Sequence, residues 1–225
     1  EELIVTIDRT APADPNAPDL LASSDSGVSD SDDVTGINTL SLTGTGEANA
    51  QVRVIAGGVI VGQGTVGSNG TWEVTTSALD DGTHTLGIEI EDLAGNINSS
   101  LTNTLNVTVD TTLPQRPTID LLSANDSGLS DLDNVTNAAN DVPFTVTSEV
   151  GASVVLKNGN TIIDTFTSTG TDVRTVTLSA GTHLLSTEVT DTAGNTSTQS
   201  EELIVTIDRT APADPNAPDL LASSD

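Results

Sequence analysis

Several residue types are missing or scarce in this 225-residue chain, and their absence excludes several kinds of site. The sequence contains no cysteine, methionine or tyrosine, and its Trp and Phe residues are limited to Trp72, Phe144 and Phe166. Without cysteine there is no disulfide framework, thiolate zinc site, iron–sulfur cluster or cysteine nucleophile. Stabilisation beyond packing must therefore come from ions that bind oxygen. The few aromatic residues leave a slender core of valine, isoleucine and leucine.

Positive charge is scarce as well. Six lysine and arginine residues face 33 acidic residues, which gives a formal net charge of −27. Nucleic acid binding needs a basic surface that displaces counterions, so it is excluded. The acids comprise 23 Asp and only 10 Glu, and the shorter carboxylate suits turns and metal-binding loops. The chain contains no apolar run of about 18 residues, so no membrane-spanning segment is predicted. A chain that opens on Glu1 without a leader is expected to be an internal fragment of a longer protein.

The chain repeats itself at two scales. Residues 1–25 recur unchanged at 201–225, so one 200-residue period is followed by the start of another. Within that period, strings of the pattern D-x-T-x-P begin at Asp8, Asp110 and Asp208. Self-similarity at a fixed spacing is typical of a tandem array. We therefore expect the end of a preceding repeat with its last strand at 1–10, two complete repeats at 11–110 and 111–210, and the truncated start of the next repeat at 211–225.

Alternation of apolar and polar residues predicts β-strands in each repeat. Leu86, Ile88 and Ile90 alternate with less apolar residues, a period of two that indicates half-buried strands, and no stretch carries the period of a long helix. In the first repeat the expected strands are 19–22, 39–44, 51–56, 59–66, 71–76, 84–91 and 101–109. About seven short strands per repeat indicate an all-β fold of tandem Ig-like antiparallel β-sandwich domains. Short, proline-stiffened linkers predict that these domains form a rod.

Four motifs in fixed order carry a resemblance to a known family. They are the D-x-T-x-P junctions, the S-D-S-G-x-S-D-x-D-[DN]-V-T loops that begin at Ser24 and Asn125, the G-T-W-E strand at Gly70, and the D-x-A-G-N turns at Asp92 and Asp191. Together they resemble bacterial Ig-like repeats, in particular the calcium-dependent extender domains of giant repeats-in-toxin (RTX) and Bap-type biofilm adhesins exported by type I secretion. The resemblance covers the whole chain and implies a surface-exposed spacer rather than a catalyst.

The densest acidic clusters are two loops at equivalent positions of the two repeats. Their members are Asp25, Asp30, Asp32 and Asp33 in the first loop, and Asp126, Asp131, Asp133 and Asn134 in the second. Close carboxylates repel by about 1 kcal/mol per pair in water and about 4 kcal/mol at a protein surface. Calcium (Ca²⁺), which takes roughly six to eight oxygen ligands, is the simplest partner, although the spacing is not that of an EF-hand. A solvated acidic loop of Asx-turns is the alternative.

A second set of candidate calcium ligands is expected at the domain junctions. The turns 92–96 and 191–195 follow the sixth strand of each repeat, and this loop of an Ig-like sandwich lies at the N-terminal pole, next to the incoming linker. The acidic loops lie at the opposite pole and face the next domain. The predicted inter-domain groups are Asp92 and Asn96 with Asp8, Asp191 and Asn195 with Asp110, and Asp208 at the following junction.

The sequence contains no visible catalytic constellation. His84 and His183 occupy equivalent turns, which favours a structural role, and the aspartates lie in polar loops that favour ionisation over acid–base catalysis. We therefore expect a non-enzymatic structural extender of a bacterial cell-surface adhesin, rigidified by calcium and projecting a distal ligand-binding domain. The expected partners are neighbouring repeats of the same chain. We expect an extracellular monomer that does not insert into a membrane and binds no nucleic acid or small-molecule substrate.

Two alternatives remain open at this point. One is an Ig-like module that itself binds a glycan or protein ligand. Sugar sites usually present aromatic faces, and Trp72, whose counterpart in the second repeat is Val173, is expected in the core. The other is a halophilic structural protein whose acidity serves solvation alone. Clustering of the acids at loops and junctions opposes that interpretation.

Overall fold

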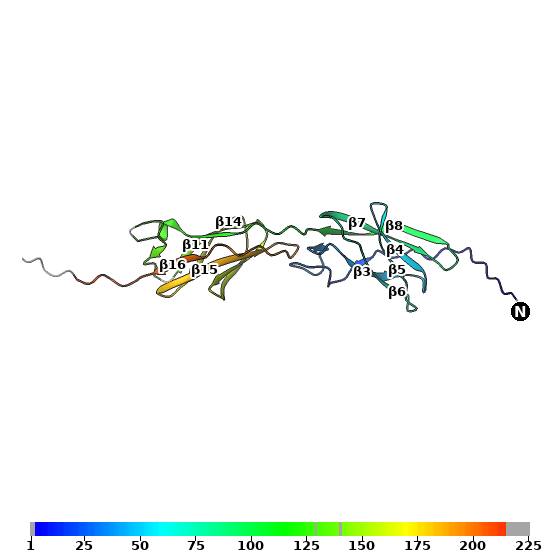
Figure 1. The fold of residues 1–225 in the computed structure, drawn as a ribbon, viewed down its shortest axis with the longest axis horizontal. Helices are drawn as coiled ribbons and strands as arrows, with labels where there is room; N and C mark the ends of the chain where they lie inside the picture. Colours follow the sequence, from blue (N-terminus) through cyan, green and yellow to red (C-terminus); the bar gives the residue numbers. More distant parts are fainter. Residues whose placement is uncertain (1–2, 129, 140, 215–225) are drawn as a thin grey trace, which may run out of the picture.

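A computed structural model describes residues 3–128, 130–139 and 141–214 and shows two all-β units that lie end to end (Figure 1). Strands β1 to β8 form unit 1, and strands β9 to β16 form unit 2. Each unit combines a three-stranded sheet with a five-stranded sheet around a shared core. This is the two-layer architecture of an Ig-like sandwich, so the predicted fold class is confirmed.

In unit 1 the small sheet has the strand order β1-β3-β6 and the large sheet has the order β2-β8-β7-β4-β5. The strand bounds are β1 Asp19–Leu20, β2 Val34–Thr35, β3 Ser41–Thr45, β4 Gln51–Ala56, β5 Val59–Thr65, β6 Thr71–Thr75, β7 Gly82–Glu91 and β8 Ile97–Val109. The long β7 and β8 run from one pole of the unit to the other, so they connect the acidic pole with the pole that carries the glycine turn.

Unit 2 repeats this arrangement, with the orders β14-β11-β9 and β10-β16-β15-β12-β13. The bounds are β9 Thr118–Leu121, β10 Val135–Thr136, β11 Asp141–Thr147, β12 Ser153–Asn158, β13 Thr161–Thr167, β14 Thr171–Thr177, β15 Gly181–Thr190 and β16 Leu203–Ile207. A single 3-10 turn, Ser123–Asn125, precedes the acidic loop of this unit in the described chain.

The core of unit 1 is organised around its single tryptophan. Trp72 of β6 is 3 % exposed and belongs to the same buried cluster as Val52 and Ile88 of the facing sheet. Its ring lies over Gly44 of β3, where a Cβ atom would come within 2.4 Å of the ring. Glycine at this position therefore makes room for the indole, and the expectation that Trp72 belongs to the core is confirmed.

Unit 2 buries a different aromatic residue in the same architecture. Phe144 of β11 is fully buried, whereas Val173 is 57 % exposed. The expected pairing of Val173 with Trp72 is wrong by one residue, because strand register places Val173 opposite Thr145, as Glu73 lies opposite Thr43. Phe166 belongs to β13 of the large sheet. The guanidinium carbon of Arg174 stacks 4.4 Å above the centroid of its ring. The two repeats thus keep their strand pattern while the bulky core residue has moved to a neighbouring strand.

All seven strands expected in the first repeat are present, and each unit adds a short eighth strand in the described chain. Val34 of β2 pairs in parallel with Thr108 of β8, and β10 pairs in the same way with β16. Alternation of apolar and polar residues cannot reveal a strand of two residues. The strand that pairs with it is the last one of the unit and lies far away in the sequence. The addition matters for function because it attaches the end of each acidic loop to the last strand of its unit.

The sequence LIVTI adopts different structures at its two occurrences. At Leu203–Ile207 it forms β16, paired with β15, and Val205 and Ile207 are buried. At 3–7 the same residues form no strand among the described residues, and Leu3 is 87 % exposed. An isolated strand has no ladder partner and no face to bury, so it is not stable alone. The strand expected within 1–10 is therefore absent from the described residues 3–10, and most of the expected repeat start at 211–225 lies outside the described residues.

The linker between the units is short and packed. It joins Val109 at the end of β8 to Thr118 at the start of β9, and both Pro114 and Pro117 are buried. Proline fixes its own φ angle, so burial of both rings restricts the linker further. In the described ranges, no helix has the length and apolar character needed to cross a membrane.

Candidate functional site

The two acidic loops share one hydrogen-bonding pattern around a buried aspartate. In unit 1, Asp25 is 5 % exposed and its Oδ2 accepts a hydrogen bond from the backbone N–H of Asp33 at 3.3 Å. In unit 2, Asp126 is 9 % exposed and its Oδ2 accepts from the N–H of Asn134 at 3.1 Å. The Oδ1 atom of each carboxylate is buried and has no hydrogen-bond partner in the described part of the chain. Each loop therefore contains a buried oxygen suited to a cation, because an unpartnered buried acceptor costs about 1–3 kcal/mol.

Negative charge accumulates at the tip of the first loop. Asp33 and Asn134 adopt the left-handed backbone region, with φ angles of 59° and 57°, which Asp and Asn tolerate better than most residues. Burial raises the pKa of Asp33, and the charges of Asp25, Asp19 and Asp32 raise it further. Three other carboxylates thus act on Asp33 at this pole of unit 1. Asn134 removes one of these charges from unit 2.

The remaining loop aspartates lie on the surface, and these are Asp30, Asp32, Asp131 and Asp133. Asp32 and Asp133 each accept a hydrogen bond from the N–H two residues later, at 3.2 and 3.1 Å, as in an Asx-turn. Within residues 3–128, 130–139 and 141–214, no three His, Cys, Asp or Glu side chains are grouped closely enough to hold a metal ion. The oxygen donors and the unpartnered Oδ1 atoms fit calcium, while the exposed aspartates would have to close over it.

The glycine turns are closed by their own aspartates. Asp191 accepts from the backbone N–H of Asn195 at 2.8 Å and from its side-chain amide at 2.9 Å. Asp92 makes the same two bonds with Asn96, at 2.8 and 2.7 Å. The Asn96 side-chain bond is the largest cause of the lowered pKa of Asp92. Both aspartates are therefore engaged within their own turns.

The linker aspartates have a local role and also contact the turns. Asp8, Asp110 and Asp208 each accept a hydrogen bond from the backbone N–H two residues later, at 3.0, 3.0 and 2.8 Å. The side-chain amide of Asn195 donates to the backbone carbonyl of Asp110 at 2.7 Å, and that of Asn96 donates to the carbonyl of Asp8 at 3.4 Å. Turn and linker thus meet as the topology suggests, but through the linker carbonyls rather than the carboxylates.

The 191–195 turn of unit 2 is seated on the C-terminal pole of unit 1. The carbonyl oxygen of Ala193 accepts hydrogen bonds from the Ser26 hydroxyl at 2.7 Å and from the Gly36 N–H at 2.8 Å. Ala193 is 0 % exposed, whereas its counterpart Ala94, in the equivalent turn of unit 1, is exposed. Docking of one unit on the other accounts for this difference.

Glycine at two positions permits the close approach. A Cβ atom on Gly27 would lie 2.3 Å from the carbonyl oxygen of Thr192, and one on Gly36 would lie 2.7 Å from Oδ1 of Asn195. Asn195 has little freedom to move aside, since its amide is bonded to Asp110. This close approach therefore leaves no room for a side chain at either place.

A further aspartate fixes the linker to unit 1. Asp81, just before β7, accepts hydrogen bonds from the N–H of Thr111 at 3.0 Å, from its hydroxyl at 2.7 Å and from the hydroxyl of Thr112 at 3.0 Å. These bonds hold the pKa of Asp81 below its ordinary value, with the Thr111 hydroxyl as the largest cause. The linker is thus anchored before it reaches unit 2.

Comparison with known families assigns both units. Residues 10–111 and 112–209 each match the family described as bacterial Ig-like domain. The chain belongs to the bacterial Ig-like domain family. Its two sandwiches are bacterial Ig-like domains in tandem, which confirms the resemblance at the level of the domain family. The sequence matches no curated protein.

Three solved structures illustrate what these bacterial Ig-like domains are similar to. One is described as the BSP domain of a biofilm-associated protein, with 23 % identity, a TM-score of 0.32, and coverage of 89 % of this chain but only 30 % of that chain. The fibronectin(III)-like modules of Clostridium thermocellum CbhA are 14 % identical with a TM-score of 0.47, and the match covers 81 % of this chain and 93 % of that chain. A C-terminal intimin fragment, solved in complex with the intimin-binding domain of its translocated receptor, is 14 % identical with a TM-score of 0.41. The match covers 88 % of this chain and 64 % of that chain.

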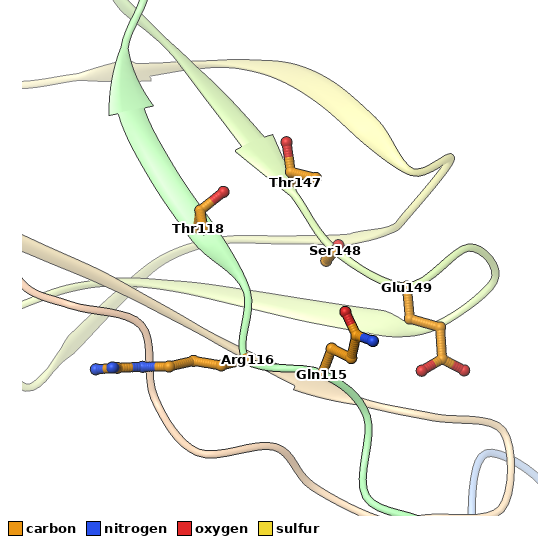
Figure 2. Close-up of a pocket in the computed structure, with 6 residues that line it drawn as sticks. All are labelled: Gln115, Arg116, Thr118, Thr147, Ser148 and Glu149. Carbon is orange, nitrogen blue, oxygen red and sulfur yellow. The ribbon is translucent and has the colours of Figure 1, made fainter.

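A hollow of about 420 Å³ lies where the linker enters the second bacterial Ig-like domain. It is lined by Gln115, Arg116, Thr118, Thr147, Ser148 and Glu149 (Figure 2). Figure 2 shows the side chain of Arg116 extending away from Gln115 and Glu149. Arg116 Nε donates to the carbonyl of Gln199 at 2.6 Å, and its guanidinium forms an ion pair with Glu201. Arg116 therefore anchors the linker to unit 2, and none of the six lining residues is aromatic.

The sequence-based prediction omits several residues of the junction. Ser26 and Gly27 lie within the acidic loop, whose predicted ligands are its aspartates, Gly36 directly follows β2, and Asp81 lies outside every predicted group. The serine–glycine pair that follows the first aspartate of both loops is a repeated signal that points to Ser26 and Gly27. Gly36 and Asp81 have different residues in unit 2, so repetition does not mark them.

Proposed function

We propose that the chain is a structural extender segment of a bacterial cell-surface adhesin, in which docked domain junctions and calcium-binding acidic loops keep the array extended and project a distal ligand-binding domain. The observation that carries this proposal is the junction, where the 191–195 turn is seated on unit 1 and Ala193 is 0 % exposed. Membership of the bacterial Ig-like family supports it. The motif resemblance to extender domains of RTX and Bap-type adhesins supports an extracellular location, a place in biofilm adhesion and type I secretion.

Rigidity follows from contacts that restrain the linker at separate points. The docked turn fixes one side of the junction through Ser26 and Gly36. Asp81 holds the linker to unit 1, and Arg116 holds it to unit 2. A single hydrogen bond contributes only about 1 kcal/mol, but contacts placed around the linker oppose bending in several directions at once.

Calcium is proposed to complete this stiffening through the acidic loops. The buried Oδ1 atoms of Asp25 and Asp126 would be the first ligands, with the exposed aspartates of each loop as further ones. When bound, the ion supplies the positive charge that relieves the repulsion on Asp33. Asp25 directly precedes Ser26, which donates to Ala193 of the next unit. Ordering of the loop would therefore also order the docking surface.

The predicted inter-domain calcium sites form a separate part of the proposal. The oxygens of one linker and one turn converge at the junction, where the Asn195 amide reaches the Asp110 carbonyl. A junction ion would use carboxylate or amide oxygens that have remaining lone pairs. The proposed ligands are Asp110 with Asp191 and Asn195, Asp8 with Asp92 and Asn96, and Asp208 at the next junction.

Export gives the calcium dependence a purpose. In a calcium-poor cytoplasm the clustered carboxylates repel one another, which lowers the stability of the folded state and suits export of an unfolded chain. Outside the cell, an ion that binds only the folded domains would favour folding by mass action. The same charges would thus serve both the transit of the chain and its final rigidity.

The alternative function is an Ig-like module that itself binds a glycan or a protein. Trp72 is 3 % exposed, and the lining of the hollow at the entrance of unit 2 contains no aromatic side chain. A sugar ring would therefore find no stacking face at either place. The extender function is the one supported by contacts in the described residues.

Calorimetric titration with calcium, and the same titration with magnesium, tests the calcium part of the proposal. Calcium should bind and raise the melting temperature, because an ion specific for the folded state adds about 2.7 kcal/mol at one hundred times its dissociation constant. Magnesium should substitute poorly, since it retains its waters and demands near-octahedral geometry. Identical melting curves in chelator and in millimolar calcium would refute calcium binding, and equal stabilisation by both ions would indicate charge screening.

A further inference from the structure

The C-terminal pole of unit 2 carries a hollow at the place where unit 1 receives its neighbour. The hollow measures about 580 Å³. Its lining consists of Ser127, Gly128, Val135, Thr136, Asn137, Asp208, Thr210 and Pro212. Ser127 and Gly128 correspond to Ser26 and Gly27, which face the docked turn in unit 1. The counterpart of the surface that receives a turn in unit 1 therefore lies at the end of unit 2. Its backbone differs at Gly128, whose N–H donates to the Val135 carbonyl at 3.1 Å, whereas Gly27 has a φ of 119°.

A matching turn is exposed at the opposite end of the chain. The 92–96 turn of unit 1 has the backbone closure of the docked turn, because Asp92 N–H donates to the Asn96 carbonyl at 3.0 Å, as Asp191 N–H donates to that of Asn195. Leu93 at its tip is 86 % exposed. The two ends of the chain thus carry the two halves of the junction seen in its middle.

We propose that the hollow at the end of unit 2 is a docking surface for the 92–96 turn of a second copy of this repeat, and that Asn137 makes this second junction looser than the first. The proposal rests on the extender function. The linker sequence 8–18, which precedes unit 1, recurs at 208–218 behind unit 2, so the second copy would follow in the same chain. An array would then alternate between two kinds of junction.

Asn137 distinguishes the two docking surfaces. Its counterpart Gly36 has no room for a side chain, since a Cβ there would lie 2.7 Å from Asn195 Oδ1 and 3.1 Å from the carbonyl oxygen of Ala193. In unit 2, Asn137 N–H donates to Ser127 Oγ at 3.0 Å, and the Ser127 hydroxyl donates to Asn137 Oδ1 at 2.8 Å. The equivalent hydroxyl of unit 1 donates to the docked turn. An incoming turn must therefore dock farther from this pole than the 191–195 turn lies from unit 1, which weakens the contact.

The test uses a chain in which residues 26–225 are appended once more after Asp225. The natural chain has no cysteine, so spin labels can be attached to single introduced cysteines. Glu73→Cys and Val173→Cys occupy equivalent exposed positions of the two units. One label pair spans the first junction within a copy, and the other spans the second junction between copies. Pulsed electron–electron double resonance then gives a distribution of label-to-label distances for each junction.

The second junction should give one defined distance with a broader distribution than the first. Asn137→Gly in the first copy should narrow it to the width of the first junction, and Gly36→Asn should broaden the first junction to the width of the second. Ala94→Arg in the second copy should abolish the defined distance. The same change in the first copy is the matched control and should have no effect, because its exposed turn faces no preceding unit in the described chain.

Two results would overturn the inference. One is a second-junction distribution that Ala94→Arg in the second copy leaves unchanged, and the other is a distribution that Asn137→Gly leaves unchanged. Each measurement is made in calcium and in chelator. Loss of any calcium response, with the substitution effects retained, would refute the calcium part of the proposed function alone. A calcium response at the first junction without the substitution effects at the second would refute this inference alone.

Discussion

Replacement of Asp25 by asparagine should stabilise unit 1 in chelator. One oxygen of this buried carboxylate accepts from Asp33, while the other has no hydrogen-bond partner among the described residues. The charge of Asp25 also contributes to the raised pKa of Asp33. Asparagine keeps an acceptor for the Asp33 N–H and removes the charge. The variant should therefore gain about 1 kcal/mol from the loss of one close carboxylate repulsion. The amide nitrogen that replaces Oδ1 is itself unpartnered, so the burial cost of that position is not recovered. Each 1 kcal/mol corresponds to about 4–8 °C in Tm for a domain of this size.

In calcium the effect of Asp25→Asn should reverse. Calcium at one hundred times its dissociation constant stabilises the parent by about 2.7 kcal/mol, and a neutral asparagine should forfeit most of that gain. Urea unfolding followed by tryptophan fluorescence measures unit 1 alone, because Trp72 is the single tryptophan. Asp126→Asn, the equivalent change in unit 2, is the control and should leave this transition unchanged. Equal destabilisation by Asp25→Asn in chelator and in calcium would refute the reasoning, since the change would then neither relieve repulsion in chelator nor remove a calcium ligand.

Three further outcomes are expected. Trp72→Ala should destabilise unit 1 by about 3–5 kcal/mol through the cavity it leaves, with the calorimetric transition of unit 2 unchanged; loss of both transitions would contradict independent cores. Ala193→Arg should shorten the maximum dimension in small-angle scattering without lowering either Tm, whereas Ala94→Arg should have no effect; equal behaviour of the two variants would argue against docking. Because the pKa values of Asp81 and Asp92 are lowered by hydrogen bonds in the folded state, their contribution to stability is present above the ordinary pKa and lost as the pH falls through the lowered values. Urea unfolding in chelator should show that loss as a stability difference between the parent and Asp81→Asn that narrows below about pH 4, and a difference that stays constant on acidification would contradict it.

The main strands could be predicted from sequence because each buries one face over several residues. Alternation of Leu86, Ile88 and Ile90 marks β7 without any knowledge of its neighbours. The strand β2 could not be found in this way, since two residues carry no period and their partner is β8 at the end of the unit. The same limit explains residues 3–7, where a strand sequence forms no strand in the described chain because no sheet lies beside it.

The candidate site was predictable in its residue types and only partly in its contacts. Topology brings Asn195 to Asp110, but which oxygen of Asp110 it meets depends on the Asx-turn that engages the carboxylate. The docking contacts of Ser26 and Gly36 depend on a neighbouring domain and on backbone atoms, which leave little trace in a single repeat. Asp81 is defined by a linker 30 residues away in sequence, so only the folded structure reveals its role.

Small-angle scattering of the 225-residue chain in millimolar calcium and in chelator tests the central claim most directly. The account predicts one elongated shape in calcium, with a maximum dimension that matches two units docked end to end. In chelator the repelling loops should loosen the docking surface, so the mean maximum dimension should fall towards that of Ala193→Arg. Scattering curves that are identical in calcium and chelator, and equally extended in both, would contradict the account and would assign the rigidity of the junction to its buried prolines and packing alone.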